Sequence, residues 1–122
     1  MPSLLEAIES ALCSGLEGIG ERVYVFSHLS HLYPYGSSIY VSYLFRIAPT
    51  PEETLHRWEV LKKAASHAIV AHGGTISHQH GVGTDHLPYL EQEKGPVGME
   101  TLSVLCRCFD PNGLMNPGKL VL

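Results

Sequence analysis

Residues 38–48, SIYVSYLFRIA, alternate in a way that decides the fold class. Successive side chains of a β-strand point to opposite faces of the sheet, so this stretch divides into two sets. The set predicted to face the core is Ile39, Val41, Tyr43, Phe45 and Ile47. The set predicted to face outward is Ser38, Tyr40, Ser42, Leu44 and Arg46. We therefore expect the hydroxyl group of Tyr40 to be free to meet a ligand.

Helices are predicted on both sides of this strand. Ser3 followed by Glu6 is a capping-box pattern, and the apolar residues after it recur at helical spacing, which predicts a helix over residues 3–14. A second helix start lies at residues 50–53, where threonine is followed by proline and glutamate, and the pattern continues to a Gly-Gly pair. This predicts a helix over residues 51–72. Its expected apolar stripe is Leu55, Trp58, Leu61, Ala65, Ala68 and Ile69.

The remaining elements are shorter or less regular. A strand is predicted over residues 23–26, followed by a polar loop over residues 27–38 that contains proline and glycine. Residues 75–80 can run extended as a short strand. A third helix is predicted to begin at Gly95-Pro96 and to end at Asp110-Pro111. Its expected inward side chains are Met99, Leu102, Leu105, Cys106 and Phe109.

The predicted order is helix, strand, strand, helix, short strand, helix. Such an order favours an α+β fold, in which an antiparallel sheet has helices packed on one face, as in half of a ferredoxin-like cap domain. We expect one domain over residues 1–122. The other face of the sheet, which carries Tyr40, then needs a partner that these residues do not obviously supply.

Composition and charge exclude several classes of function. The chain has 8 Lys and Arg against 12 Asp and Glu, a net charge of −4, and its basic residues are scattered, which argues against a nucleic-acid or anionic-membrane surface. It contains no long apolar run and no signal-peptide pattern, so we expect a cytoplasmic protein. The odd count of 3 cysteines predicts buried or half-buried free thiols rather than disulfides.

The stretch GGTISHQHGVGTDH, residues 73–86, gathers histidine, aspartate and glycine. If its centre is extended, His78 and His80 share one face and Gln79 takes the other, while Gly81 lies in a turn where backbone can approach a ligand. The cluster also raises the alternative of a metal-dependent hydrolase, because imidazole and carboxylate are metal ligands. The spacing fits that alternative poorly, since GVGT separates the HxH pair from the Asp-His pair.

The other histidines have different expected roles. His56 and His67 lie within the predicted helix over residues 51–72, on its surface, and His72 suits the negative end of that helix. His28 and His31 flank the loop that precedes Tyr40. We keep these two as candidate binding residues.

Three segments carry a resemblance to a known family. They are SHLSHLYPYGSSIYVSY (27–43), GGTISHQHGVGTDHLPYL (73–90) and FDPNGLMNPGKL (109–120). Together and in this order they resemble the C-terminal part of FAD-linked oxidases of the vanillyl-alcohol-oxidase type, above all the alkyldihydroxyacetonephosphate (alkylglycerone-phosphate) synthases and their bacterial relatives. The resemblance covers about residues 22–122.

The resemblance implies a cap or substrate domain whose open sheet face lies over the flavin ring. The family's glycine-rich FAD-binding domain is absent from these 122 residues, so we expect a fragment that is inactive alone and does not retain FAD. Its expected partners are an FAD-binding domain, in the same or a neighbouring chain, and a small-molecule or lipid-like substrate. A homodimer is compatible with this picture, and membrane contact is expected only of the full-length protein.

The resemblance also implies roles for individual residues. Tyr40 matches the family's catalytic tyrosine. His78 and His80, also expected to be catalytic, match two histidines of a SHHHGVG segment whose middle histidine is Gln79 here. Glutamine cannot titrate but can still hydrogen-bond. The further residues expected to bind substrate or cofactor are Gln79, Gly81, Arg46, His28, His31, Asn116 and Lys119. For Asn116, a role as a turn residue before proline is the structural alternative.

The implied reaction is the exchange of an acyl for an alkyl chain on dihydroxyacetone phosphate, a step of ether-lipid synthesis. The first alternative is an FAD-dependent 2-hydroxy-acid oxidase or dehydrogenase acting on glycolate or D-lactate. Those enzymes carry a histidine of a GNLH motif where Tyr40 stands here, which favours the synthase. The alternatives from other classes are the metal-dependent hydrolase and a non-catalytic binding module.

Overall fold

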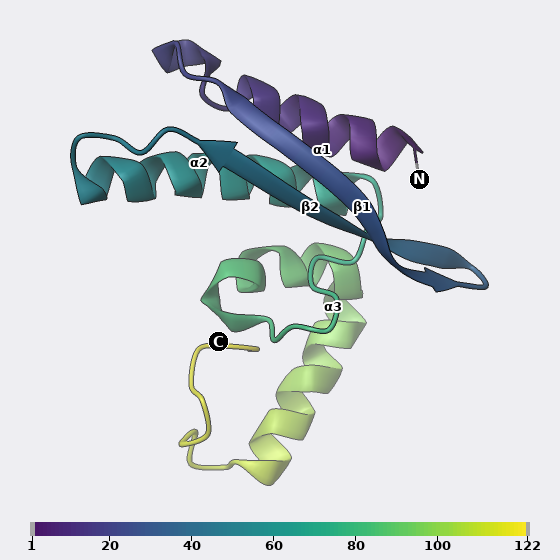
Figure 1. The fold of residues 1–122 in the computed structure, drawn as a ribbon. Coiled ribbons are helices and arrows are strands. Elements are labelled where there is room, and N and C mark those ends of the chain that lie inside the picture. Colours follow the sequence, from purple (N-terminus) through teal and green to yellow (C-terminus); the bar gives the residue numbers. More distant parts are fainter. Residues whose placement is uncertain (1, 122) are drawn as a thin grey trace. The chain divides into compact units, whose positions relative to one another are not determined.

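A computed structural model describes residues 2–121 of the chain (Figure 1). The chain separates into two compact units, Met1–His72 and Gly73–Leu122. No helix among the described residues combines the length and the apolar character that crossing a membrane requires.

The first unit is a β-hairpin with helices on one face. Its elements are α1 (Pro2–Ser14), a 3₁₀ turn η1 (Glu17–Ile19), β1 (Val23–Tyr33), β2 (Gly36–Phe45) and α2 (Pro51–Ala71) (Figure 1). The strands pair antiparallel. The predicted α+β class, with helices on one face of an antiparallel sheet, is confirmed.

The core of this unit joins both helices to one face of the hairpin. Its buried side chains are Ile8, Leu12, Leu16, Val23 and Leu61. Val41, Tyr43 and Phe45 pack against them, as the alternation predicted, and burial raises the pKa of Tyr43. Tyr40 is 53% exposed on the opposite face, also as predicted. Ile47 was expected in the core, but β2 ends two residues earlier and its side chain is exposed.

The hairpin is longer than predicted. Residues 27–33 form strand rather than loop, and the turn is confined to Pro34 and Tyr35. The segment SHLSHLY finds its hydrogen-bonding partner in residues 36–41 of the next strand, which local composition does not reveal. The tip of the hairpin extends past α1 and α2 (Figure 1), and Leu29 and Leu32 on β1 are exposed.

Helix α2 begins and ends almost where its signals predicted. The Thr50 hydroxyl accepts the Glu53 amide at 3.2 Å, and Nδ1 of His72 lies 2.9 Å from the carbonyl oxygen of Ala68 at the other end. His56 and His67 are on the surface as expected. The prediction for Leu55 is wrong, because its side chain is exposed rather than part of the buried apolar stripe.

Two buried positions of α2, Ser66 and Arg57, were not predicted by the stripe, and Arg57 is the charged one. Its Nη1 donates to the carbonyl oxygen of Arg46 at 2.9 Å and lies 3.4 Å from Oε1 of Glu21, and its Nη2 lies 3.4 Å from Oε1 of Glu53. A buried guanidinium is tolerated where its two terminal nitrogens meet acceptors in this way. Arg57 thereby joins α2 to the end of β2 and to the segment that precedes β1.

The second unit contains α3 (Gly83–Phe109), which is two helical segments joined at Gly95, where φ is 68°. The segment after Pro96 was predicted, whereas the one before Gly95 was not. The predicted strand over residues 75–80 is wrong: these residues form bends, and Gln79 has a φ of 59°. Without strand geometry, the argument that placed His78 and His80 on one face no longer holds.

The second segment of α3 is more exposed than its pattern suggested. Met99, Leu102 and Cys106 are half-buried as expected, but Leu105 and Phe109 are exposed. The three cysteines are free thiols, as predicted. Cys106 is half-buried, whereas Cys13 and Cys108 are exposed, contrary to expectation.

Candidate functional site

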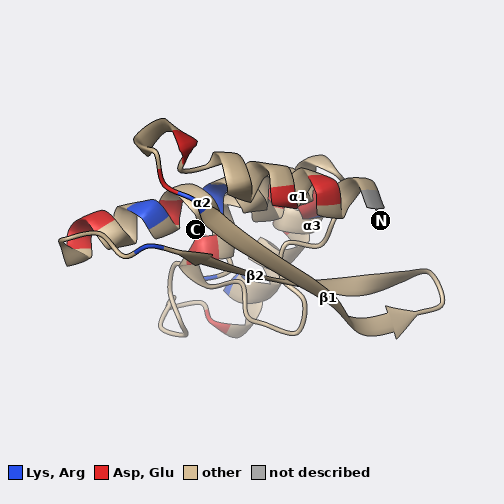
Figure 2. Ribbon diagram, turned by 45° about the horizontal axis from the view of Figure 1, so that its top comes forward, with Lys and Arg blue, Asp and Glu red and all other residues tan. Residues whose placement is uncertain are grey.

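The face of the hairpin that points away from α1 and α2, called here the outer hairpin face, carries cross-strand pairs of exposed side chains. The pairs are Tyr24 with Leu44, Phe26 with Ser42, and His28 with Tyr40. Residues 23–45 include no Lys, Arg, Asp or Glu, and Figure 2 shows the hairpin clear of both charge colours. An exposed aromatic surface without charges is typical of a surface that meets a ligand or another domain.

Tyr40 and His28 form the polar centre of this face. They lie directly opposite each other on β2 and β1, and their rings stack with centroids 5.1 Å apart and an interplanar angle of 24°. A phenol beside an imidazole offers both a hydrogen-bond donor and an acceptor. The pair is therefore suited to holding or moving a proton at the surface of the hairpin.

A β-bulge brings His31 to the same face. The pairing shifts register between Leu29 and His31, so that His31 lies opposite Ser38. Because Ser38 is two residues from Tyr40, the two share a face of β2, and the side chain opposite Ser38 shares it too. Simple alternation along β1 would have placed His28 and His31 on opposite faces. The bulge thus gathers His28, His31 and Tyr40 on one surface.

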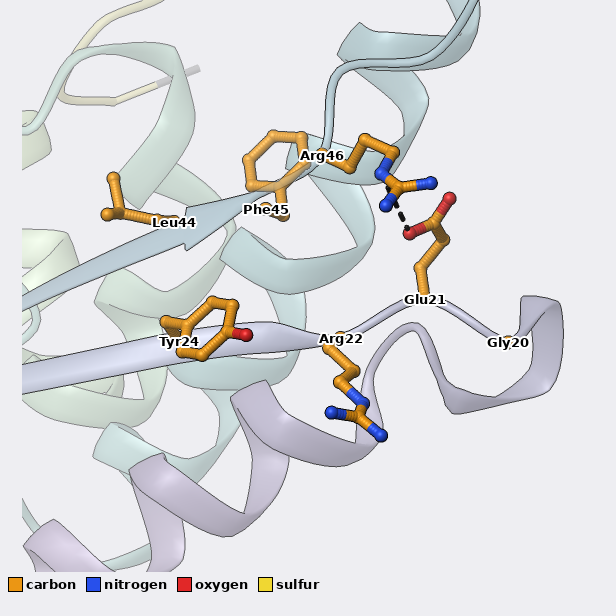
Figure 3. Close-up of a pocket in the computed structure, with 7 residues that line it drawn as sticks. All are labelled: Gly20, Glu21, Arg22, Tyr24, Leu44, Phe45 and Arg46. Atoms are coloured by element: carbon orange, nitrogen blue, oxygen red, sulfur yellow. Dashed lines mark ion pairs between the residues drawn. The ribbon is translucent and has the colours of Figure 1, made fainter.

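Arg46 lies at the base of the outer hairpin face, just beyond β2. Its side chain is 78% exposed, and its Nε lies 3.9 Å from Oε2 of Glu21. It borders an open hollow of about 590 Å³, whose walls include Tyr24 and Leu44 (Figure 3). Arg46 is therefore available to a ligand at this end of the hairpin.

In the second unit, residues 75–81 form a compact loop, called here the histidine loop. Its buried Ile76 donates its amide to Oε2 of Glu93 at 2.8 Å. The Ser77 hydroxyl lies within hydrogen-bond reach of the carbonyl oxygens of His80, at 2.9 Å, and Gly81, at 3.4 Å. These bonds, rather than a neighbouring strand, give the loop its shape. His78 is half-buried, and His80 and Gln79 are exposed.

Glu93 is held ionised by its neighbours. Its partial burial acts to raise the pKa of its carboxyl group. The hydrogen bond from Lys94, at 2.7 Å, the Ile76 amide and the charge of Lys94 outweigh this effect, and the pKa is lowered. An ionised carboxylate is the stronger acceptor for the Ile76 amide.

We predict that Glu93→Ala frees the histidine loop. The buried Ile76 amide would lose its acceptor, so its hydrogen exchange should accelerate about tenfold or more, as measured by NMR. Because the pKa of Glu93 is lowered from 4.5, the protection should be complete above that pH and fall as the pH drops through the folded-state pKa. Glu91→Ala, an exposed position on the same helix, is the control. Unchanged exchange at Ile76 in Glu93→Ala would contradict the anchoring role.

The C-terminal segment is organised by Asp110. Its carboxylate accepts the amides of Met115 at 2.7 Å and Leu114 at 3.0 Å, which lower its pKa. Asn116 is exposed with a φ of 49°, a conformation that asparagine adopts more readily than most residues, which agrees with its alternative as a turn residue. Lys119 is half-buried.

The candidate residues thus fall into separate groups. His28, His31, Tyr40 and Arg46 belong to the first unit, and the remainder, His78, Gln79, His80, Gly81, Asn116 and Lys119, belong to the second. Within residues 2–121, no three His, Cys, Asp or Glu side chains are grouped so that they could hold a metal ion.

Sequence reasoning missed four residues that shape these sites. Tyr24 and Phe26 were missed because they belong to a continuous apolar run, residues 23–26, in which exposed and buried positions look alike. Arg57 lies four residues before Leu61 on α2, so the two share a helical face. A cation on the apolar face of a helix could have indicated a buried ion pair. Glu93 gave no signal, because its bond to Ile76 spans 17 residues.

Comparison with known proteins gives a consistent family assignment. The family model described as FAD linked oxidases, C-terminal domain, matches residues 2–120. The alkyldihydroxyacetonephosphate synthase of Trypanosoma brucei brucei is 26% identical over 115 residues, 94% of this chain and 18% of the relative. That of Dictyostelium discoideum is 28% identical over 102 residues, 84% of this chain and 16% of the relative.

A second group of relatives carries a different name. The mitochondrial D-lactate dehydrogenase (cytochrome) of Arabidopsis thaliana is 38% identical over 73 residues, 60% of this chain and 13% of the relative. The chain therefore spans less than a fifth of the length of each of these three relatives. No solved structure gives a significant match.

Proposed function

The chain belongs to the family of FAD-linked oxidase C-terminal domains, and from this premise we propose that it is the substrate-side domain of an enzyme like alkyldihydroxyacetonephosphate synthase. Family membership implies FAD in the full-length protein. The reaction proposed is the exchange of an acyl for an alkyl chain on dihydroxyacetone phosphate. The observation that carries the proposal is the exposed Tyr40, stacked on His28 at the centre of the outer hairpin face.

The outer hairpin face fits one side of a flavin. Tyr24, Phe26 and Tyr40 expose aromatic surface there, which can pack against a flat and partly apolar ring system. When bound, FAD supplies the electron-accepting chemistry, and the protein supplies binding, orientation and electrostatics. We propose that the outer hairpin face is covered by the FAD-binding domain of the same or a neighbouring chain.

Tyr40 is the proposed proton-transferring residue. Its phenol is exposed, and its ring is held by His28 across the hairpin, so the hydroxyl group is presented from a rigid strand rather than from a loop. A positioned acid or base of this kind contributes roughly 10²- to 10⁴-fold to a rate. His28 is the proposed partner for the proton.

The histidine loop has a separate proposed role. His78 and His80 are proposed to hydrogen-bond the substrate, with His80 the more exposed of the two. Gln79 can donate and accept hydrogen bonds but cannot carry a charge, so it does not replace a cationic histidine. We therefore assign the proton transfer to Tyr40 rather than to the loop.

The second candidate function is oxidation of a 2-hydroxy acid. The Arabidopsis D-lactate dehydrogenase supports it with the higher identity, 38%, although that match covers 60% of this chain. The D-2-hydroxyglutarate dehydrogenase of Stutzerimonas stutzeri is similar in the same way, 35% identical over 57% of the chain. The synthase stands first because its alignment covers 94% of the chain.

The test is to fuse the chain to the FAD-binding region of the Trypanosoma synthase. We expect a yellow fusion protein that exchanges acyl for alkyl chains on dihydroxyacetone phosphate, measured with a labelled fatty alcohol. The FAD-binding region alone is the control. Oxidation of D-lactate or D-2-hydroxyglutarate without chain exchange would establish the second candidate. A folded fusion protein with bound flavin and neither activity would contradict both.

A further inference from the structure

We propose that the second segment of α3 is a contact between two copies of this chain, which pair antiparallel across a two-fold axis. This segment follows Gly95 and ends at Phe109. It belongs to the second unit and shares no residue with the outer hairpin face, so the pairing does not rest on the flavin-dependent function.

One face of this segment is apolar and exposed. Positions 97, 101, 104, 105 and 108 recur at helical spacing and form a continuous stripe, called here the α3 stripe. Its members are Val97, Thr101, Val104, Leu105 and Cys108, all of them exposed. The Thr101 hydroxyl donates to the carbonyl oxygen of Val97 at 2.8 Å, so it keeps its partner when the stripe is covered. A continuous exposed apolar face is typical of a protein–protein contact.

The charges beside the α3 stripe favour a second copy as the partner. Glu100 and Arg107 lie seven residues apart on one flank of the stripe, and both side chains are exposed. When two stripes pair antiparallel, the same flanks meet, and Glu100 of each copy lies beside Arg107 of the second. A parallel pair would bring Glu100 against Glu100 and Arg107 against Arg107. The antiparallel pairing is therefore favoured, with the axis midway, between Ser103 and Val104.

The shape of the segment is self-complementary in the same alignment. A hollow of about 490 Å³ lies along the first half of the stripe, and its lining residues are Pro96, Val97, Glu100, Thr101, Val104 and Leu105. At the other end of the segment, the Phe109 side chain is 79% exposed. Pairing Glu100 with Arg107 of the second copy places Phe109 beside Gly98 of that copy, which has no side chain to exclude the ring. Each copy thus supplies both a hollow and a ring, as a two-fold contact requires.

Sedimentation equilibrium of the 122-residue chain tests the pairing. One helix face per copy makes a small contact, so the dissociation constant should be micromolar, and the average mass should rise from monomer towards dimer between about 1 µM and 1 mM. Phe109→Ala and Val104→Lys should each raise that constant about tenfold or more, because the first removes the ring and the second buries a charge. Ile19→Lys, at an exposed apolar position of the first unit, is the control.

The outcomes of this experiment are distinct. Circular dichroism checks that the variants, all at exposed positions, keep their helix content. A chain that remains monomeric over the whole concentration range would overturn the proposal. So would a dimer that neither Phe109→Ala nor Val104→Lys weakens, or one that Ile19→Lys weakens equally.

Charge reversal tests the antiparallel alignment. Glu100→Arg gives the flank two arginines and Arg107→Glu gives it two glutamates, so each variant alone should dimerise about tenfold or more weakly. An equal mixture of the two variants should form a heterodimer at least about tenfold tighter than either homodimer. Glu91→Arg, an exposed position on the first segment of α3, is the control. Single variants that dimerise as well as the original chain, or a mixture that recovers nothing, would contradict the alignment.

The native thiols locate the contact without a substitution. Cys108 lies in the α3 stripe and Cys13 lies on α1, and both are exposed. Because pairing covers the stripe, alkylation of Cys108 should slow about tenfold as the chain concentration rises far above the dissociation constant, while Cys13 reacts at a constant rate. Peptide mass spectrometry measures both rates. A Cys108 rate that does not change with concentration would refute the α3 contact.

Discussion

Tyr40→Phe is expected to lower turnover about 100-fold or more in the chain fused to an FAD-binding region. The change removes the hydroxyl group and keeps the ring, so the stacking with His28, at 5.1 Å, and the apolar character of the outer hairpin face are preserved. Flavin content and the midpoint of thermal unfolding should therefore remain the same. Turnover is measured as the rate of chain exchange with saturating substrates.

Tyr43→Phe is the matched control for this experiment. Tyr43 is three residues along the same strand on the opposite face, where it packs against the core and burial raises the pKa of its phenol. Its change should leave turnover within a few-fold and act, if at all, on stability. If Tyr43→Phe lost activity while Tyr40→Phe kept full activity, the active surface would lie on the other face of the hairpin, and the assignment made here would be wrong.

Leu61→Ala is expected to lower the free energy of unfolding by about 3 kcal/mol. Leu61 is 0% exposed and lies where α1, α2 and the hairpin meet. The packing there is tight: a Cβ atom added at Gly15 would lie 2.8 Å from Cδ2 of Leu61. Truncation removes apolar contacts and leaves a cavity that this packing cannot readily close. Urea unfolding followed by circular dichroism measures the change.

Leu55→Ala provides the comparison on the same helix. Leu55 is 55% exposed, so its truncation removes little buried area and should change the free energy of unfolding by about 0.5 kcal/mol or less. The difference between the two variants tests the position of the core rather than the helix propensity of leucine. Equal destabilisation by both variants would contradict the core assigned to α2.

The sequence predicted those parts of the fold that are encoded locally. The capping pattern at Thr50 and the helical spacing of apolar residues gave α1 and α2 to within one residue of their ends, although Ser3 lies inside α1. The strict alternation of residues 38–45 gave the faces of β2. In each case a single segment carries the whole signal, because the periodicity of its own side chains reflects which of its faces is buried.

The errors arose where structure depends on a distant partner. Residues 27–33 become strand because they pair with the strand that follows the turn, although their composition is that of a loop. Residues 75–80 are prevented from extending by bonds that involve Glu93 and Ser77, and the first of these spans 17 residues. The bond to Glu93 cannot be predicted from the segment itself, because Glu93 lies outside it.

The candidate site divides in the same way. The amino-acid sequence determined that Tyr40 points away from the core and that the chain resembles FAD-linked oxidases, since both follow from patterns within short segments. Only the tertiary structure decided that His28 stacks on Tyr40 and that a bulge turns His31 to the same face. Only the tertiary structure, likewise, decided that Arg57 is buried against Glu21. The physical reason is that strand register and ion pairing are set by which segments meet, and a one-residue shift in register changes the face of every side chain beyond it.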